Sequence, residues 1–422
     1  MIKKFLFSMI LCLTILLNLN FTNAMGLNEQ EARFICALSS MAAYEDDKGV
    51  MARGMLSSYG WKISSIKEES DKANAKALVI TKTLDDGSLV KILSISGTDD
   101  IKDAEVDFRL HRVYSGFNNK DTLVHQGFKD YSEVILDNDF GKSLVDEIIK
   151  NPTEKLYITG HSLGGAVAIV TAANLIELGF PEESLEVITF GAPAVGNRGF
   201  AEEYKDKIHL SRVTMSGDPI KKALQSLGYV HFGDVIKYKP DNKIVSHFPH
   251  MMVVYLDCAL RDFYDYKSDN PKDYQKENSS DTNDELIYIA PMQVMKNSFS
   301  DEDFKYVKAI MKDQITQRFK SAVYDESEYK EVEEIGDLAD FDNTIDDVLV
   351  KAKAANCKYI LVQYLQAKKI KTDKDGDYRV SLEEIYYDLN GFPTSMQTAS
   401  VTTKELTMLE AAIFAQESLI LK

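Results

Sequence analysis

The chain has 422 residues, which is too long for one typical hydrophobic core and predicts two domains. Its composition is 45% hydrophobic and 27% charged, which is ordinary for a globular protein and excludes wholesale disorder. A formal net charge of −17 argues against nucleic acids and anionic membrane surfaces as partners, because phosphate groups are bound by clustered Lys and Arg. A neutral lipid or a small ester is compatible with this charge.

The N-terminal segment 1–24 has the layout of a secretory signal peptide. Lys3 and Lys4 precede an apolar run from Phe5 to about Leu17, and a short polar stretch ends at Ala24. A membrane anchor is the alternative, but the apolar run is short for a bilayer-spanning helix. We therefore expect cleavage after Ala24, a secreted or cell-envelope location, and no transmembrane segment in the mature chain.

Residues 25–260 have the pattern of an α/β domain. A helix is expected at 27–45, where Asn28 can cap the chain and Glu31 follows three residues later. Two strands, 75–83 and 88–96, are joined by a turn at Asp85–Gly87. Strands and helices then alternate, which predicts a mostly parallel sheet. The further elements are a helix at 131–150, a strand at 155–159, a helix at 166–179, and strands at 186–193, 209–219 and 229–238.

A change in composition separates this domain from the rest of the chain. Residues 261–285 are almost wholly polar, which predicts a linker or a mobile loop. Residues 286–422 predict a smaller accessory α/β domain: a strand, a helix capped by Ser300, a second helix at 344–356, and three further strands.

The nucleophile motif is Gly160-His161-Ser162-Leu163-Gly164, which fits G-x-S-x-G. The serine of such a motif lies on a sharp turn between a strand and a helix, so that its hydroxyl stands clear of the backbone. Side chains at Gly160 or Gly164 would collide across this turn. The motif lies between a short β-like run and a long amphipathic helix, which is the context that distinguishes it from a glycine-rich turn with an incidental serine.

Five blocks of sequence resemble the class 3 (fungal-type) lipase family, in the family's order. They are ILSISGTDD (92–100), VHQGF (124–128), ITGHSLGGAVA (158–168), VITFGAPAVGN (187–197) and SRVTMSGDPI (211–220). With the helix that ends in AAY (42–44), the resemblance covers about residues 27–260. It implies an α/β-hydrolase fold and the hydrolysis of carboxylic esters, usually of glycerol, without a cofactor.

This resemblance also implies partners for Ser162. A serine hydroxyl needs a base to take its proton and an acid to orient that base. Asp218 occupies the family's strand-then-Asp-Pro block and is the expected acid. His250 opens a predicted helix with Tyr255 five residues on and is the favoured base; His247 and His231 remain alternatives.

Two amides are expected to stabilise the oxyanion. One belongs to Leu163, directly after the nucleophile, and the other to Thr98 in the block that matches the family's oxyanion loop. Ser96 stands where the family often has Arg, which removes a local salt bridge but not the donors. The stretch 99–110, where lipases carry a lid, is highly charged and lacks Trp, which favours a soluble-ester esterase over an interfacial lipase.

Two further motifs have weaker functional interpretations. Cys36 and Cys258 occupy places that some family members join by a disulfide, against the alternative of buried thiols. Asp373, Asp375, Asp377 and Glu384 have the spacing of a calcium loop. However, Tyr378 stands where that loop requires Gly, so a β-hairpin is the alternative.

The expected function is therefore a secreted serine carboxylic-ester hydrolase, a lipase or esterase that acts on a lipid or small ester through an acyl-enzyme. A phospholipase or acyltransferase with the same residues and a non-catalytic binding module on this fold are the alternatives. Residues 286–422 suggest cell-surface association, and the sequence leaves acyl-chain length, head group and oligomeric state open.

Overall fold

The structure is a computed structural model of the 422-residue chain. It describes residues 26–97, 114–117, 119–137, 139–151, 154–239, 249–271, 286–319, 321–325, 330–332, 338–370 and 378–420. The chain divides into two compact units, and each is described by itself. The first comprises residues 1–32, 63–213 and 220–236, and the second comprises residues 33–62, 214–219 and 237–422.

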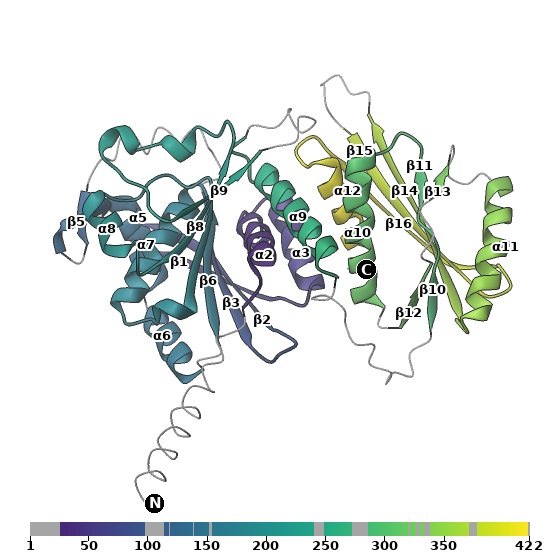
Figure 1. Ribbon diagram of the computed structural model, residues 1–422, viewed down its shortest axis with the longest axis horizontal. Coiled ribbons are helices and arrows are strands. Elements are labelled where there is room, and N and C mark those ends of the chain that lie inside the picture. The colour runs from purple at the N-terminus through teal and green to yellow at the C-terminus, as the bar shows by residue number, and fades with distance from the viewer. Residues whose placement is uncertain are drawn as a thin grey trace, which may run out of the picture. The chain divides into compact units, whose positions relative to one another are not determined.

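The first unit is built on a seven-stranded sheet in the order β1-β2-β3-β6-β7-β8-β9 (Figure 1). Strands β3, β6, β7 and β8 are parallel neighbours, whereas β2 pairs antiparallel with β3. This arrangement confirms the predicted α/β class. The strands are β1 (Lys62–Glu69), β2 (Asn74–Thr83), β3 (Leu89–Ile95), β6 (Lys155–His161), β7 (Leu185–Phe190), β8 (His209–Met215) and β9 (Asp234–Tyr238), with a separate hairpin of β4 (Tyr114–Phe117) and β5 (Asn119–His125).

Helix α7 is the central helix of the first unit. It contacts β3, β6 and β7, and it packs against α5, which in turn contacts β2. Nearly all of α7 is apolar and buried, as expected for a helix that other elements cover on every side. The helices of this unit are α5 (Gln126–Ile135), α6 (Phe140–Lys150), α7 (Leu163–Glu177) and α8 (Arg198–Tyr204).

The second unit contains a second sheet, centred on β14. Strand β15 pairs antiparallel with β14 and with β16, while β10 and β11 pair in parallel with successive halves of β14. Side chains of β14 alternate between two cores: Ile360 and Val362 contribute to one, and Leu361 to the other. The strands are β10 (Ile287–Ile289), β11 (Gln293–Met295), β12 (Ala322–Tyr324), β13 (Lys330–Val332), β14 (Tyr359–Lys369), β15 (Tyr378–Tyr387) and β16 (Pro393–Thr403).

Helices complete the second unit, and two of them begin with the predicted caps. Asn28 accepts a hydrogen bond from the Glu31 amide at 2.9 Å, and Ser300 accepts one from the Asp303 amide at 3.1 Å. The helices are α2 (Glu29–Ala42, which begins in the first unit), α3 (Asp47–Ser58), α9 (Met252–Asp269), α10 (Asp301–Arg318), α11 (Leu338–Ala354) and α12 (Met408–Ile420).

The linker predicted at 261–285 was placed to begin within a helix. Residues 261–269 are the last part of α9, not a polar connection. Their charged side chains are paired: Arg33 donates to Asp262 at 2.7 Å, and Lys305 donates to Asp265 at 2.6 Å. The polar composition therefore reflects ion pairs along a helix, which a composition test does not distinguish from a solvated linker.

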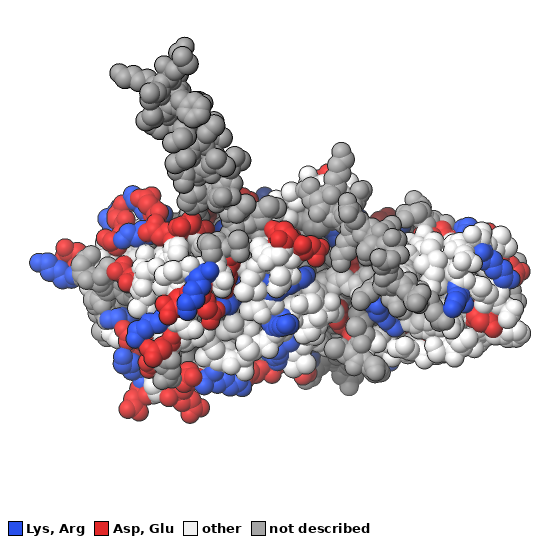
Figure 2. Space-filling model, turned by 90° about the horizontal axis from the view of Figure 1, so that it is seen from below, with Lys and Arg blue, Asp and Glu red and all other residues white. Residues whose placement is uncertain are grey.

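The helices and the visible surface charge of the described residues bear on membrane contact. No helix within these ranges combines the length and the apolar character that crossing a bilayer requires. Figure 2 shows Lys and Arg side chains intermingled with Asp and Glu on the face that it draws.

A buried carboxyl group on α12 predicts how stability depends on pH. Glu417 is 3% exposed and accepts hydrogen bonds from Ser58 and Gln314, both at 2.7 Å. Burial raises its pKa from 4.5 to about 7. Its contribution to stability is therefore complete below pH 4.5 and is lost as the pH rises through 7, which amounts to about 3 kcal/mol.

The variant Glu417→Gln tests this expectation, because glutamine stays neutral throughout the range. Its free energy of unfolding, measured by urea denaturation between pH 4.5 and 8, should fall less with pH than that of the parent. The control is Glu69→Gln, which changes an exposed glutamate of β1. Equal pH slopes for the parent and Glu417→Gln would show that Glu417 titrates normally.

Candidate active site

Ser162 lies on the turn between β6 and α7, and its backbone is in the left-handed region. Its φ is 57° and its ψ is −122°, a combination that L-residues rarely adopt. The Ser162 amide donates to the Phe190 carbonyl at 2.9 Å, and the Ser162 carbonyl accepts from the Ala166 amide at 3.2 Å. The turn is therefore held on both sides, as a strained nucleophile turn requires.

Two glycines permit this turn, as the sequence predicts. A Cβ atom on Gly160 would lie 2.4 Å from the carbonyl carbon of Gly164. A Cβ atom on Gly164 would lie 2.2 Å from the carbonyl oxygen of Ile95. Since real Cβ contacts are longer than this, only glycine allows α7 to start so close to the end of β3.

We expect Gly164→Ala to lower the free energy of unfolding by about 1–3 kcal/mol, because backbone must move to admit the methyl group. Thermal or urea unfolding measures the loss. The control is Gly127→Ala on α5, where the nearest atom would lie 3.4 Å away and alanine is the better helix former. Equal stability of the two variants would contradict the close approach.

Of the two predicted oxyanion donors, the structure describes Leu163 but not Thr98. Leu163 is the first residue of α7, where amides have no carbonyl partner within the helix and the helix dipole favours negative charge. Thr98 lies outside the described residues, as does the charged stretch 99–110. Ile95 and Gly97, just before Thr98, lie within 3.0 Å of a Cβ built on Gly164. The loop that carries Thr98 therefore starts beside the Ser162 turn.

Asp218 and His250 lie together in the second unit. His250 Nδ1 is 2.8 Å from Asp218 Oδ2, and the two side chains are fully buried. Because an ionised carboxylate only accepts hydrogen bonds, Nδ1 carries the proton, and Nε2 of a neutral His250 is left as the basic nitrogen. This arrangement is compatible with the acid and base roles that the sequence analysis expects for Asp218 and His250, which remain predictions.

Tyr255 completes the surroundings of Asp218. Its hydroxyl donates to Asp218 Oδ2 at 2.5 Å and accepts from the Met215 amide at 3.0 Å. Burial, and then the Asp218 charge, raises the pKa of Tyr255, so that the phenol stays protonated. The sequence supplied Tyr255 only as a marker of the helix register, because a hydrogen bond across 37 residues leaves no local signal.

The turn that precedes Asp218 lies against the turn that precedes His250. Gly217 has a φ of +86°, and a Cβ atom built on it would lie 3.3 Å from Cγ of Pro249. Gly217 immediately precedes Asp218, and Pro249 immediately precedes His250. The two turns therefore fix the approach of the two side chains.

His231 and His247 were the alternatives to His250 as the base. His231 belongs to the first unit, and its Nε2 donates to the Lys221 carbonyl at 2.9 Å. Burial and the neighbouring Arg212 charge lower its pKa to about 4. Its protonated nitrogen is thus committed to a backbone carbonyl. His247 lies outside the described residues.

The disulfide suggested for Cys36 and Cys258 is absent from the structure. Neither cysteine forms a disulfide bond, and neither does Cys357, the third cysteine of the described residues. Burial and the neighbouring Asp257 raise the pKa of Cys258 to about 12. Since the thiolate is the reactive form, Cys258 is a poor nucleophile at neutral pH.

The calcium interpretation is not supported at Glu384. Its buried carboxylate accepts from Arg318 at 2.7 Å, from Gln363 at 2.9 Å and from Gln416 at 3.1 Å. Asp373, Asp375 and Asp377 lie outside the described residues, and no group of metal-ligating side chains gathers within the described ones. The flanking strands β14 and β15 pair antiparallel, so the hairpin alternative is confirmed for them.

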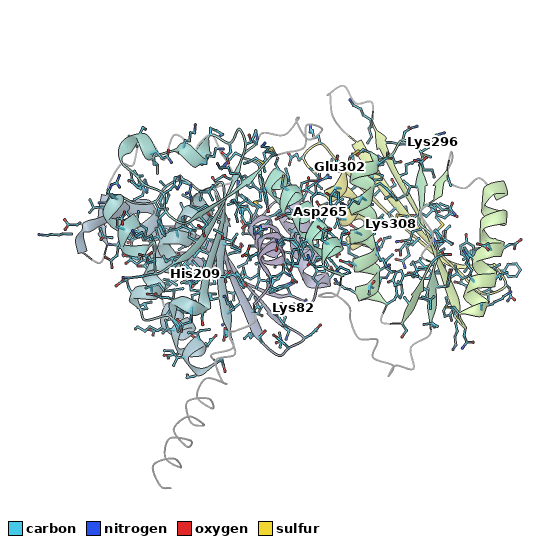
Figure 3. The ribbon with its side chains drawn as sticks, in the orientation of Figure 1. Lys82, His209, Asp265, Lys296, Glu302 and Lys308 are labelled. Atoms are coloured by element: carbon cyan, nitrogen blue, oxygen red, sulfur yellow. The ribbon has the colours of Figure 1, made fainter. Side chains whose placement is uncertain are left out.

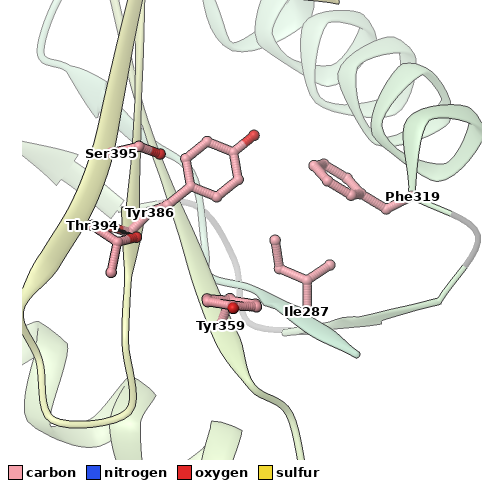
Figure 4. A pocket seen from close by; sticks show the side chains of 6 residues that line it. All are labelled: Ile287, Phe319, Tyr359, Tyr386, Thr394 and Ser395. Atoms are coloured by element: carbon pink, nitrogen blue, oxygen red, sulfur yellow. Dashed lines mark hydrogen bonds between the residues drawn. The ribbon is translucent and has the colours of Figure 1, made fainter. Parts of the chain in front are cut away.

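A hollow in the second sheet has no residue suited to acid–base or nucleophilic catalysis at neutral pH. This cavity of about 280 Å³ is apolar except for hydroxyl groups (Figure 4). Its lining comprises Ile287, Phe319, Tyr359, Tyr386, Thr394 and Ser395. Burial raises the pKa of Tyr386 to about 12, so it stays protonated.

Comparison with known proteins points to one family. Residues 92–226 match the family described as lipase (class 3). The chain is 34% identical over 126 residues to secreted mono- and diacylglycerol lipase A of Penicillium cyclopium, covering 29% of this chain and 40% of that protein. It is 42% identical over 100 residues to secreted mono- and diacylglycerol lipase 1 of Fusarium solani, covering 24% and 29%. The chain thus spans less than half the length of these relatives.

Among solved structures, lipase II from Rhizopus niveus is 23% identical to the chain. The superposition covers 50% of this chain and 82% of that one, with a TM-score of 0.42.

Proposed function

Because residues 92–226 make this chain a member of the class 3 lipase family, with an α/β-hydrolase fold, we propose that it is a secreted serine hydrolase of carboxylic esters. The observation that carries the proposal is the buried hydrogen bond between His250 Nδ1 and Asp218 Oδ2, at 2.8 Å, which holds the imidazole by one nitrogen and leaves the lone pair on Nε2. Glycerol esters are the proposed substrates, since the Penicillium and Fusarium relatives are named as mono- and diacylglycerol lipases.

In the proposed mechanism, Ser162 Oγ attacks the ester carbonyl carbon while His250 Nε2 takes its proton. The amides of Leu163 and Thr98 hold the oxyanion that forms. His250 then gives the proton to the departing alcohol oxygen, which leaves an acyl group on Ser162. Water then attacks the acyl carbon while His250 Nε2 takes its proton, the bond between the acyl carbon and Ser162 Oγ breaks to release the carboxylic acid, and His250 returns the proton to Oγ. Asp218 stabilises the imidazolium in both steps.

Export is part of the proposal. The segment 1–24 has the layout of a signal peptide, and the two fungal relatives are named as secreted. Detection of the mature chain beginning at Met25 outside the producing cells supports export. Recovery of the uncleaved chain from inside the cells contradicts it.

The test is fatty acid release by the purified chain from monoacyl-, diacyl- and triacylglycerols and from p-nitrophenyl esters of short and long acyl chains. Hydrolysis of glycerol esters supports the proposal, and a preference for soluble short-chain esters identifies an esterase. Release from phospholipids alone redirects the assignment to a phospholipase. No release from any ester contradicts hydrolase activity.

A further inference from the structure

Helix α9 links the Asp218–His250 pair to the C-terminal part of the second unit. It begins at Met252, two residues after His250, and its first turn carries Tyr255, the hydrogen-bond donor to Asp218. A shift or rotation of α9 would therefore move both members of the pair. Whatever fixes α9 also fixes the alignment of acid and base.

The next turns of α9 are tied to two helix starts. Asp257 is fully buried: its Oδ1 accepts from the Thr407 hydroxyl at 3.0 Å, and its Oδ2 accepts from Arg261 Nε at 2.7 Å. Arg261 in turn donates to Asp303 Oδ1 at 2.7 Å. Thr407 immediately precedes α12, and Asp303 lies in the first turn of α10.

Both partners are themselves held in place. Thr407 and Glu410 form a capping box: the Glu410 amide donates to the Thr407 hydroxyl at 3.1 Å, and the Thr407 amide donates to the Glu410 carboxylate at 2.9 Å. Asp303 is bonded to Ser300, the cap of α10, at 2.6 Å. The bonds to α9 therefore come from residues that capping hydrogen bonds hold at the starts of two helices.

Contacts to α10 continue along α9. Asp265 accepts from Lys305 at 2.6 Å and from the Tyr306 hydroxyl at 3.0 Å, and Lys267 pairs with Asp313. Figure 3 labels Asp265 on α9 and Lys308 on α10. Directional bonds at successive turns fix both the rotation and the position of a helix, which apolar contact alone does less well.

We propose that Asp303 and Thr407, with the helices that they begin, form a clamp on Asp257 and Arg261 that keeps α9, and through it Asp218 and His250, in register. The C-terminal part of the chain is then a positioning element of the active site, a role that the sequence analysis did not assign to the accessory domain. The grouping of residues 214–219, α9 and residues 286–422 in one compact unit agrees with this role. The kinetic part of the proposal rests on the proposed function.

The test variant is Thr407→Val, which removes the hydroxyl at nearly constant shape. We expect kcat for a p-nitrophenyl ester to fall between about 10- and 100-fold, because small displacements of catalytic groups are costly, with KM nearly unchanged. The kcat–pH profile should also change, since the alignment of the acid and the base changes. Thr407→Ser restores the hydroxyl and should recover most of kcat, and Thr402→Val, on exposed β16, should match the parent.

A second readout does not depend on catalysis. The His250 Nδ1 proton, in its short bond to Asp218, should give a far-downfield proton resonance in the parent, identified by its loss in His250→Gln. Thr407→Val should broaden or abolish it, and Thr402→Val should not. If the parent hydrolyses no ester, the proposed function fails while this resonance still tests the clamp.

Asp303→Asn is the variant to use if Thr407→Val does not fold, because it removes the charge that Arg261 faces while it keeps the size of the side chain. A folded Thr407→Val or Asp303→Asn with parental kcat, pH profile and His250 resonance overturns the proposal. A loss of all three that Thr407→Ser reverses supports it.

Discussion

Replacing Ser162 by alanine should lower the turnover of an ester substrate by about 10⁶-fold, because no other group in the proposed mechanism can accept the acyl chain. KM should change little, since the substrate contacts and the oxyanion amides remain. Release of p-nitrophenol at saturating substrate measures the loss. Ser162 has a positive φ, a backbone conformation that is unfavourable for alanine, so thermal unfolding is used to check that the variant folds.

The matched control for Ser162→Ala is Ser226→Ala, which removes an exposed hydroxyl of the first unit. Its turnover should stay within about twofold of the parent, as for most surface substitutions. Parental activity in Ser162→Ala would mean that another residue is the nucleophile. Loss of activity in both variants would point to damage unrelated to the hydroxyl.

The second large effect is expected for Asp218→Asn, with turnover falling by about 10⁴-fold. Asp218 Oδ2 accepts from both His250 Nδ1 at 2.8 Å and Tyr255 Oη at 2.5 Å. An asparagine that turns its NH2 group toward His250 makes Nδ1 an acceptor, so that Nε2 carries the proton and cannot take one from Ser162. The neutral amide also loses the charge that stabilises the imidazolium.

The measurement for Asp218→Asn is kcat across pH, with Asp234→Asn on the exposed part of β9 as the control. Asp234→Asn should leave the profile unchanged. A loss smaller than about tenfold in Asp218→Asn would mean that Asp218 does not orient the base. His250→Gln should be at least as damaging as Asp218→Asn, because it removes the base itself.

The parts of the site that the sequence predicts are those whose chemistry is local. Gly160, Ser162 and Gly164 lie within five residues, and the turn that they form follows from the collision that any side chain at either glycine would cause. Asp218 was predicted from its place in a family block, and His250 from its place at the start of a helix with Tyr255 five residues on. Their hydrogen bond across 32 residues could not be predicted from the residues alone.

The parts that the sequence misjudges depend on partners far away in the chain. Arg261 and Asp265 look like linker residues until Asp303 and Lys305, about 40 residues later, are seen to pair with them. Glu384 fits a calcium loop by spacing, but Arg318 and Gln363 already bind its carboxylate. A run of charged residues indicates a solvent-exposed segment only when those residues have no partners elsewhere in the chain.

Covalent labelling by an alkyl p-nitrophenyl phosphonate tests the central claim, that Ser162 is an activated nucleophile, most directly. The reagent phosphonylates a serine that has a working base and oxyanion site, and the tryptic peptide 156–198 contains Ser162. We expect one phosphonyl group per chain, located on Ser162 by mass spectrometry, and labelling that is greatly slowed in Asp218→Asn. An unlabelled chain, or a label on any other residue, would contradict the account.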